Sequence, residues 1–293
     1  MAIRMWSCED RCAPFVEVFS RTAVAHDYDL RLIVPSATPP SGFTRLLTHY
    51  RHLSPNPRNF ELASFRRWFE IAARVSPADR FVLADSDLFI GQSFRALPKD
   101  IRDFEGLVGS IGASKEVLED GVNGGFSVWT GILLKEFCDY IVASYESGTE
   151  QLAALYATKV AAGNPRASIS DMTLLFAWVQ HARVPFFNTN QILRDQLGRA
   201  IYIDHNFFMP EALGARFAMT LGRKSVHWRQ GDLRLQLRDG APVIAASLHL
   251  GGRYKIMAAD LEQRSQMGLT AKSAYILGGR TGRKLLAKIG IHR

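Results

Sequence analysis

The sequence predicts an α/β fold built on a mixed, mostly parallel sheet, followed by a helical C-terminal appendage. Short apolar strands alternate with helical patterns from the start of the chain, and this alternation implies parallel pairing with helices packed on the sheet. The chain has 293 residues, 47% hydrophobic and 22% charged, so it can bury the core of one large α/β domain. We expect residues 1–258 to form that domain and residues 259–293 a basic tail.

The chain opens with a β-α-β pattern. We expect a strand at residues 3–7, a helix at 13–25 and a strand at 30–34. Residues 35–57 carry five prolines and little periodicity, which predicts mostly loop. Apolar side chains return at helical spacing over residues 61–75, which predicts the second helix of the domain.

A strand at residues 81–84 then leads directly into Asp85. The later segments fit an α/β domain that builds its site from strand ends. We expect strands at 107–111, 124–130, 184–187, 200–203 and 243–249, and helices at 132–145 and 169–180.

Composition excludes several classes of protein. The three cysteines are too few for a disulfide framework, so reduced thiols are expected. The glycines at 106, 109 and 112 have the wrong spacing for a dinucleotide fingerprint, so we assign no nicotinamide cofactor. Charged residues come too early for a signal peptide, and no apolar run approaches the roughly 20 residues of a membrane span. We therefore expect a cytoplasmic protein.

The formal charge of +8 is concentrated at the C-terminus, where residues 261–293 hold seven basic residues against one acid. Such a basic tail has three possible uses. It could lie on the anionic inner face of a membrane, bind nucleic acid, or form a plain solvated or packed helix. The segment matches no nucleic-acid-binding motif, so we expect no nucleic-acid partner.

Two carboxylates lie one residue apart in Asp85-Ser86-Asp87, directly after an apolar strand. Charges this close repel unless a cation holds them, and a hard divalent ion with oxygen ligands would do so. The carboxyl end of a strand is also where open α/β sheets bind ligands. Because Asp and Ser favour turns as well, the triplet alone leaves a plain turn open.

A second motif lies far downstream, where His249, Gly252 and Lys255 have the spacing H-x-x-G-x-x-K. A neutral imidazole can add a nitrogen ligand to an oxygen-rich manganese site, glycine lets the backbone approach a phosphate, and lysine supplies compact positive charge. Together with the two aspartates, these residues suit a metal-bound diphosphate.

These two motifs, with Asn123-Gly124-Gly125 between them, resemble the GT-A glycosyltransferases, most closely glycosyltransferase family 8. The resemblance implies a Rossmann-like α/β/α sandwich and transfer of a sugar from a nucleotide sugar, usually a uridine diphosphate sugar, with retention of configuration. It implies that Mn²⁺, or Mg²⁺, binds at Asp85, Asp87 and His249.

The same resemblance implies further site residues. It places the diphosphate near Lys255 and the sugar donor or acceptor near Asn123 and Asp171. The remaining members of the implied donor site are Ser7, Asp10, Arg67, Ser86, Gly124 and Gly252, with Arg66 as the alternative to Arg67.

The expected function is metal-dependent transfer of a sugar to a saccharide or lipid-linked saccharide acceptor. Two alternatives stay open: a metal-dependent nucleotidyl or phosphoryl transferase, and a catalytically silent, membrane-associated binding protein. Ile256-Met257 follow the lysine where the family often has Pro-Trp, so retention and inversion also stay open. Inversion needs a carboxylate base, and Asp171 is the candidate.

Overall fold

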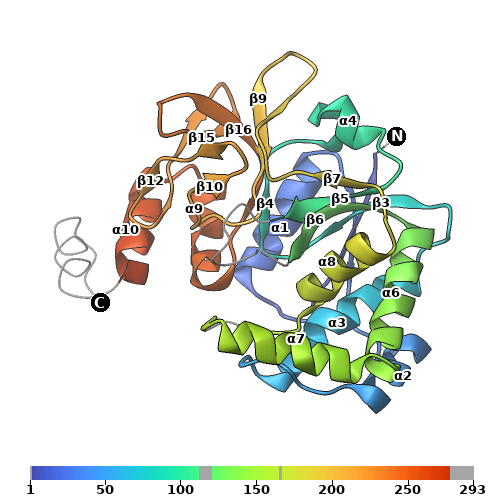
Figure 1. Cartoon of the computed structure of the whole chain (residues 1–293). Coiled ribbons are helices and arrows are strands. Elements are labelled where there is room, and N and C mark those ends of the chain that lie inside the picture. The colour runs from blue at the N-terminus through green and yellow to red at the C-terminus, as the bar shows by residue number, and fades with distance from the viewer. Residues whose placement is uncertain (1, 112–120, 165–166, 278–293) are drawn as a thin grey trace.

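A computed structural model describes residues 2–111, 121–164 and 167–277 and shows a central six-stranded sheet with a second sheet beside it (Figure 1). The central order is β2-β1-β3-β6-β5-β7, in which β6 alone runs antiparallel to its neighbours. These strands are β1 (Arg4–Cys8), β2 (Asp29–Ile33), β3 (Arg80–Ala84), β5 (Leu107–Ile111), β6 (Val122–Thr130) and β7 (Phe186–Asn188). The expected α/β class with a mixed, mostly parallel sheet is thus confirmed.

The second sheet has the order β14-β15-β16-β9-β8, and a short strand, β4, pairs with the end of β16. Its strands are β4 (Leu88–Ile90), β8 (Leu193–Arg194), β9 (Ala200–Ile203), β14 (Val226–Arg229), β15 (Asp232–Gln236) and β16 (Pro242–His249). Two small hairpins lie nearby, β10 (Glu211–Ala212) with β11 (Ala215–Arg216) and β12 (Met219–Thr220) with β13 (Arg223–Lys224).

The structure has a helix at each of the four places where the sequence predicts one, and it has further helices besides. Their bounds are α1 (Pro14–Ala25), α2 (Ser41–His49), α3 (Arg58–Ala72), α4 (Lys99–Arg102), α6 (Gly131–Glu146), α7 (Thr149–Ala161), α8 (Asp171–His181), α9 (Ala258–Glu262) and α10 (Gln266–Leu277), with 3₁₀ turns η1 (Phe94–Ala96) and η2 (Gly252–Met257). Ser170 caps α8 and Thr130 caps α6 through side-chain oxygens that accept from backbone N–H groups of the first turn.

Most of residues 35–57 lie outside helices and strands, as expected, but the segment also contains α2, which was not predicted. Pro39 and Pro40 precede the helix instead of interrupting it, a position that proline tolerates. Phe43 and Leu46 are buried and give α2 its apolar face. The predicted β-α-β opening and the helix before β3 are confirmed by β1, α1, β2 and α3.

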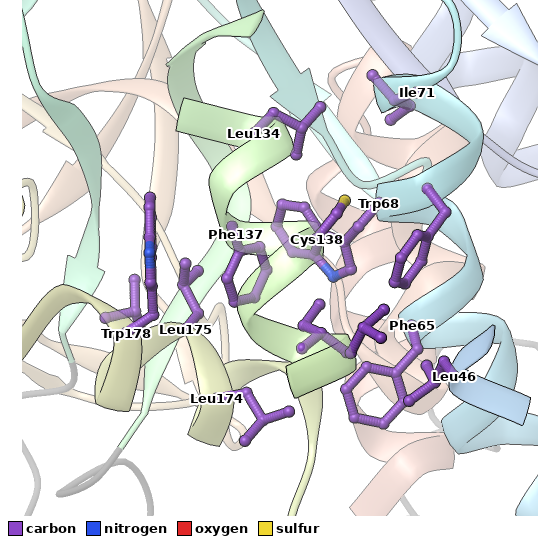
Figure 2. Close-up of a cluster of buried hydrophobic side chains, with 14 of the residues drawn as sticks. Leu46, Phe65, Trp68, Ile71, Leu134, Phe137, Cys138, Leu174, Leu175 and Trp178 are labelled. Carbon is purple, nitrogen blue, oxygen red and sulfur yellow. The ribbon is translucent and has the colours of Figure 1, made fainter. Parts of the chain in front are cut away.

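One face of the central sheet packs against α2, α3, α6 and α8 through a large aromatic core (Figure 2). Trp68 of α3 lies edge-on to Phe137 of α6, with ring centroids 5.2 Å apart, and Trp129 of β6 stacks on Trp178 of α8 at 6.0 Å. Strand β3 sends Phe81 and Leu83 into this core.

The opposite face of the central sheet packs against α1 and the second sheet. Val82 and Ala84 of β3 point into this second core with Phe19 of α1 and Ile201 and Ile244 of the second sheet. Since β3 is buried on both faces, nearly every one of its residues is apolar up to its end. Asp85 is the first residue past that end, which places it at the edge where the two sheets meet.

The C-terminal segment is helical as far as the structure describes it. Leu261 of α9 and Leu269 and Ile276 of α10 are buried in a third core against the second sheet. The packed part of the chain thus extends to Leu277, and the basic residues 278–293 lie outside the described residues. Within the described part, no helix is long and apolar enough to cross a membrane.

Candidate metal centre

The pairing of β4 with β16 brings the two sequence motifs together. Asp85, Ser86 and Asp87 form the turn between β3 and β4. Leu88 then pairs antiparallel with His249, the last residue of β16, and the backbone N–H of Leu250 donates to the carbonyl of Asp87 at 3.0 Å. A three-residue strand therefore sets the register that carries His249 to the aspartates.

The side chains of Asp85, Asp87 and His249 converge on one point. His249 Nε2 lies 3.2 Å from Asp87 Oδ1 and 3.8 Å from Asp85 Oδ2. One ligand atom from each residue lies within 4.8 Å of the others. Two carboxylate oxygens and one imidazole nitrogen at this separation are a donor set that fits Mn²⁺, so these residues can hold a divalent ion.

Cations at the site keep Asp87 ionised. Burial alone would raise the pKa of Asp87, but His249 and Lys255 hold that pKa well below its usual range. Lys255 Nζ lies 3.0 Å from Asp87 Oδ2. Burial likewise opposes the charged form of His249, yet the carboxylates of Asp87 and Asp85 raise its pKa to about 9. In the metal-free protein, His249 is therefore an imidazolium held between the aspartates.

Of the two candidate arginines, Arg67 faces the aspartates. It forms ion pairs with Asp85 and, through Nη2 at 2.8 Å, with Asp171 Oδ2. Arg66 pairs with Glu70 instead, with its Nε 2.9 Å from Oε1. One arginine thus connects the D-x-D turn to the start of α8.

The carboxylate of Asp171 is occupied by several donors. Besides Arg67, the indole N–H of Trp68 donates to Oδ2 at 3.0 Å, and the backbone N–H of Met172 donates to Oδ1 at 2.9 Å. Asp171 is also buried, with 4% of its surface exposed. The arrangement suits an anchor for Arg67 better than a base that takes a proton from a substrate.

The Asn123-Gly124-Gly125 segment of β6 lies beside the same site. The Asn123 side chain accepts from the Gly125 N–H at 2.7 Å and donates to the carbonyl of His205 at 3.1 Å. A Cβ on Gly125 would lie 2.9 Å from Asp85 Oδ2, and one on Gly124 would lie 2.6 Å from the Trp68 ring. Both glycines therefore make room for other side chains.

The residues predicted after the first strand lie less directly at the site. Ser7 is buried in β1, and its hydroxyl has no hydrogen-bond partner among the described residues. Asp10 is exposed. Between them, Glu9 is buried and accepts from the Ser86 hydroxyl at 2.6 Å, so it ties the end of β1 to the D-x-D turn.

Sequence reasoning missed Glu9 and its partner Arg11. Glu9 is an acid directly after a strand, the same signal that singled out Asp85. The Arg11 guanidinium bonds the Glu9 carboxylate and lies 5.3 Å from the centre of the Phe15 ring, and Lys255 Nζ lies 4.8 Å from the same ring centre. Phe15 thus brings two cations to one side of Asp87.

Gly252 begins the 3₁₀ turn that carries Lys255. Its φ of +62° is in the left-handed region that favours glycine. This turn directs the chain after His249 so that Lys255 returns toward Asp87.

No protein-family model and no curated protein sequence matches the chain. Among solved structures, mouse xyloside xylosyltransferase 1 in its apo form is similar over 64% of this chain and 84% of that chain, at 10% identity and a TM-score of 0.43. The galactosyltransferase LgtC in complex with donor and acceptor sugar analogues is similar over 59% of this chain and 69% of that chain, at 12% identity and a TM-score of 0.35. Likeness at this level carries no argument about function, which rests on the site itself.

Proposed function

We propose that this chain is a metal-dependent glycosyltransferase that moves a sugar from a nucleotide sugar to a saccharide or lipid-linked saccharide acceptor. One observation carries the proposal: Asp85, Asp87 and His249 converge within 4.8 Å at the carboxyl end of β3, with the ammonium group of Lys255 3.0 Å from Asp87. A centre with three ligands and an adjacent cation suits an ion that shares its coordination with phosphate oxygens.

Asp85, Asp87 and His249 would hold Mn²⁺ or Mg²⁺. When bound, such an ion would neutralise the negative charge that develops on a leaving diphosphate. Lys255 adds a compact positive charge on the same side and can turn from Asp87 toward a phosphate, because its side chain is long and partly exposed. Arg67 fixes the orientation of Asp85 from the other side.

We propose retention of anomeric configuration. An inverting enzyme needs a free carboxylate base, and the Asp171 carboxylate already accepts from Arg67, Trp68 and Met172. With retention, the acceptor hydroxyl attacks from the face that the diphosphate leaves, and a diphosphate oxygen takes its proton. NMR of the product's anomeric proton tests this, and an inverted product would contradict it.

The uridine nucleotide is proposed from the resemblance of the D-x-D and H-x-x-G-x-x-K motifs, and contact with the inner face of an anionic membrane from the charge of residues 278–293. Calorimetric titration of uridine diphosphate, with and without Mn²⁺, tests the donor site. We expect binding that requires the metal. Equal binding without Mn²⁺, or none at all, would contradict the proposal.

A further inference from the structure

One loop, residues 204–207, holds His249 at three of its polar groups. The Asp204 carboxylate accepts from the His249 backbone N–H at 3.2 Å, and the His205 carbonyl is 2.8 Å from His249 Nδ1. The backbone N–H of Phe207 donates to the His249 carbonyl at 3.1 Å. Because a carbonyl only accepts, the contact with His205 requires a proton on Nδ1 of His249.

The same loop also positions Asn123. The carbonyl of His205 accepts from the Asn123 side chain at 3.1 Å as well as from His249. A shift of this one carbonyl would therefore move both side chains that border the aspartates on this side.

A buried lysine fixes the loop from behind. Lys224 on β13 is fully buried, forms an ion pair with Asp204 and donates to the carbonyl of Asn206 at 2.9 Å. Its ammonium group also lies 5.1 Å from the centre of the Tyr202 ring and 4.7 Å from that of Phe217.

Burial of the Asp204–Lys224 ion pair costs free energy. Burial lowers the pKa of Lys224, and the Asp204 carboxylate opposes this change. A charge pair without solvent contact is weak evidence for added stability, because the cost of removing both charges from water offsets much of their attraction. The Lys224 ammonium group does, however, bind two groups of the loop, the Asp204 carboxylate and the Asn206 carbonyl, and so holds both in place.

We propose that Asp204 and Lys224 are positioning residues that fix the 204–207 loop and thereby hold His249 with Nδ1 protonated and Nε2 directed at Asp85 and Asp87. The inference rests on the proposed function only in taking His249 as a metal ligand. A histidine ligand whose other ring nitrogen donates to a fixed carbonyl has its ligating nitrogen and ring plane set in advance. Asp204 and Lys224 act here through the loop and do not touch the metal.

The test compares two double variants with a matched control. Asp204→Asn/Lys224→Met removes both charges and the lysine's bond to Asn206, whereas Asp204→Asn/Lys224→Gln keeps an amide donor at position 224. Asp195→Asn is the control, because Asp195 is a buried carboxylate in the turn before β9, and Asp204 follows that strand's other end. Each protein is measured for Mn²⁺ affinity by calorimetry, for melting temperature, and for the exchange of the His249 Nδ1–H by ¹⁵N NMR without metal.

We expect the methionine variant to bind Mn²⁺ about 10- to 100-fold more weakly and to lose the slowly exchanging Nδ1–H signal. The glutamine variant should recover most of the Mn²⁺ affinity and most of the Nδ1–H signal. The control should change neither the affinity nor the signal, even if its melting temperature falls. If the methionine variant does not fold, Asp204→Asn alone carries the same expectation. A folded variant with wild-type Mn²⁺ affinity and Nδ1–H exchange would overturn the proposal, as would an equal loss in the control.

The NMR measurement separates this inference from the proposed function, because it needs neither metal nor sugar. If no nucleotide sugar is turned over but the Nδ1–H signal depends on Lys224 as expected, the positioning role stands and the proposed function fails. If turnover is found and the signal does not depend on Lys224, the proposed function stands and the positioning role fails.

Discussion

At the scale of single residues, His249 is the group that we expect to make metal binding depend on pH. It lies between two carboxylates that raise its pKa to about 9, against the effect of burial, and its Nδ1 is already committed to the carbonyl of His205. A metal ion bound by His249 would therefore have to displace the proton on Nε2. Since a metal requires the neutral imidazole, metal affinity and proton release are coupled.

Mn²⁺ binding at pH 7.5 should release about one proton and should tighten about tenfold for each unit of pH up to about 9, because His249 is protonated below that pKa. Calorimetric titrations in two buffers of different ionisation enthalpy measure the protons released. Equal binding heats in both buffers would show that His249 gives up no proton and is not a ligand.

Asp87→Asn keeps the shape of the side chain and removes the charge that faces His249 and Lys255. We expect Mn²⁺ affinity to fall at least about 100-fold and donor turnover to reach background, because a neutral amide is a weak ligand. The fold should survive. Calorimetry and circular dichroism check this, with Asp239→Asn in an exposed turn as the matched control. Full activity in Asp87→Asn would refute the metal role of Asp87.

Residues within short motifs could be predicted from the sequence, and residues joined only by the fold could not. Asp85 and Asp87 are separated by one residue and follow an apolar strand, so their chemistry is visible in the sequence. Lys224 and Asp204 lie on different elements with no motif around either, and only the packing of β13 against the 204–207 loop brings them together.

At the scale of secondary-structure elements, the short strand β4 has a large effect on the site. It is three residues long, and its pairing with β16 determines that His249 lies opposite Leu88. Three apolar residues between two aspartates and a glycine give no period that predicts a strand. The sequence motifs and their resemblance to a family led us to expect the aspartates and His249 to meet. Only the structure shows the strand register that brings them together.

The two glycines of β6 should respond differently to alanine. Gly124→Ala puts a Cβ 2.6 Å from the buried Trp68 ring, which is packed against Trp129 and Phe137 and cannot shift. We expect a loss of about 1–3 kcal/mol in the free energy of unfolding from overpacking. Chemical denaturation measures it, and wild-type stability would contradict the tight packing.

Gly125→Ala instead meets the ends of two side chains, Asn123 Oδ1 at 2.8 Å and Asp85 Oδ2 at 2.9 Å. These polar groups can turn aside, so stability should change less than in Gly124→Ala. Because one of them is a proposed ligand, Mn²⁺ affinity should fall about tenfold. Calorimetry on both alanine variants provides the comparison, and unchanged affinity in Gly125→Ala would contradict the placement of Asp85.

The first helices and strands of the chain show which sequence patterns predict secondary structure. Apolar periodicity predicts helix α1 and strands β1 and β2. Helix α2 was missed because the prolines of residues 35–57 were counted without regard to their positions. Prolines at the ends of a segment permit a helix, and prolines in its interior break it. In the second sheet, β9 and β16 were predicted as strands, whereas β4, β8, β14 and β15 were not, because each is only two to five residues long.

At the scale of the whole molecule, the second sheet and α9 to α10 support the site from the side opposite the helical layer. Figure 1 shows this part of the chain beside the central sheet. The buried residues Leu261 and Leu269 tie the C-terminal helices to that sheet. Five basic residues follow Leu277 in the sequence.

Truncation after Leu277 should leave the melting temperature and Mn²⁺ affinity unchanged, and truncation before Leu261 should destabilise the protein by removing core side chains. Loss of the five basic residues beyond Leu277 should weaken binding to anionic vesicles more than about tenfold, at roughly 1 kcal/mol for each charge near the surface. Vesicle sedimentation measures this. Unchanged binding would exclude the tail as a membrane contact.

The proposed site would use a divalent ion to release the sugar of a nucleotide sugar from its diphosphate. A screen of nucleotide sugars for hydrolysis and transfer, with and without Mn²⁺ and with Asp87→Asn as control, tests it most directly. We expect Mn²⁺-dependent release of a nucleoside diphosphate from at least one donor, and we expect Asp87→Asn to abolish it. Release of a nucleoside monophosphate would indicate a nucleotidyl or phosphoryl transferase instead. No release from any donor, or release that Asp87→Asn leaves intact, would contradict the proposed glycosyltransferase function.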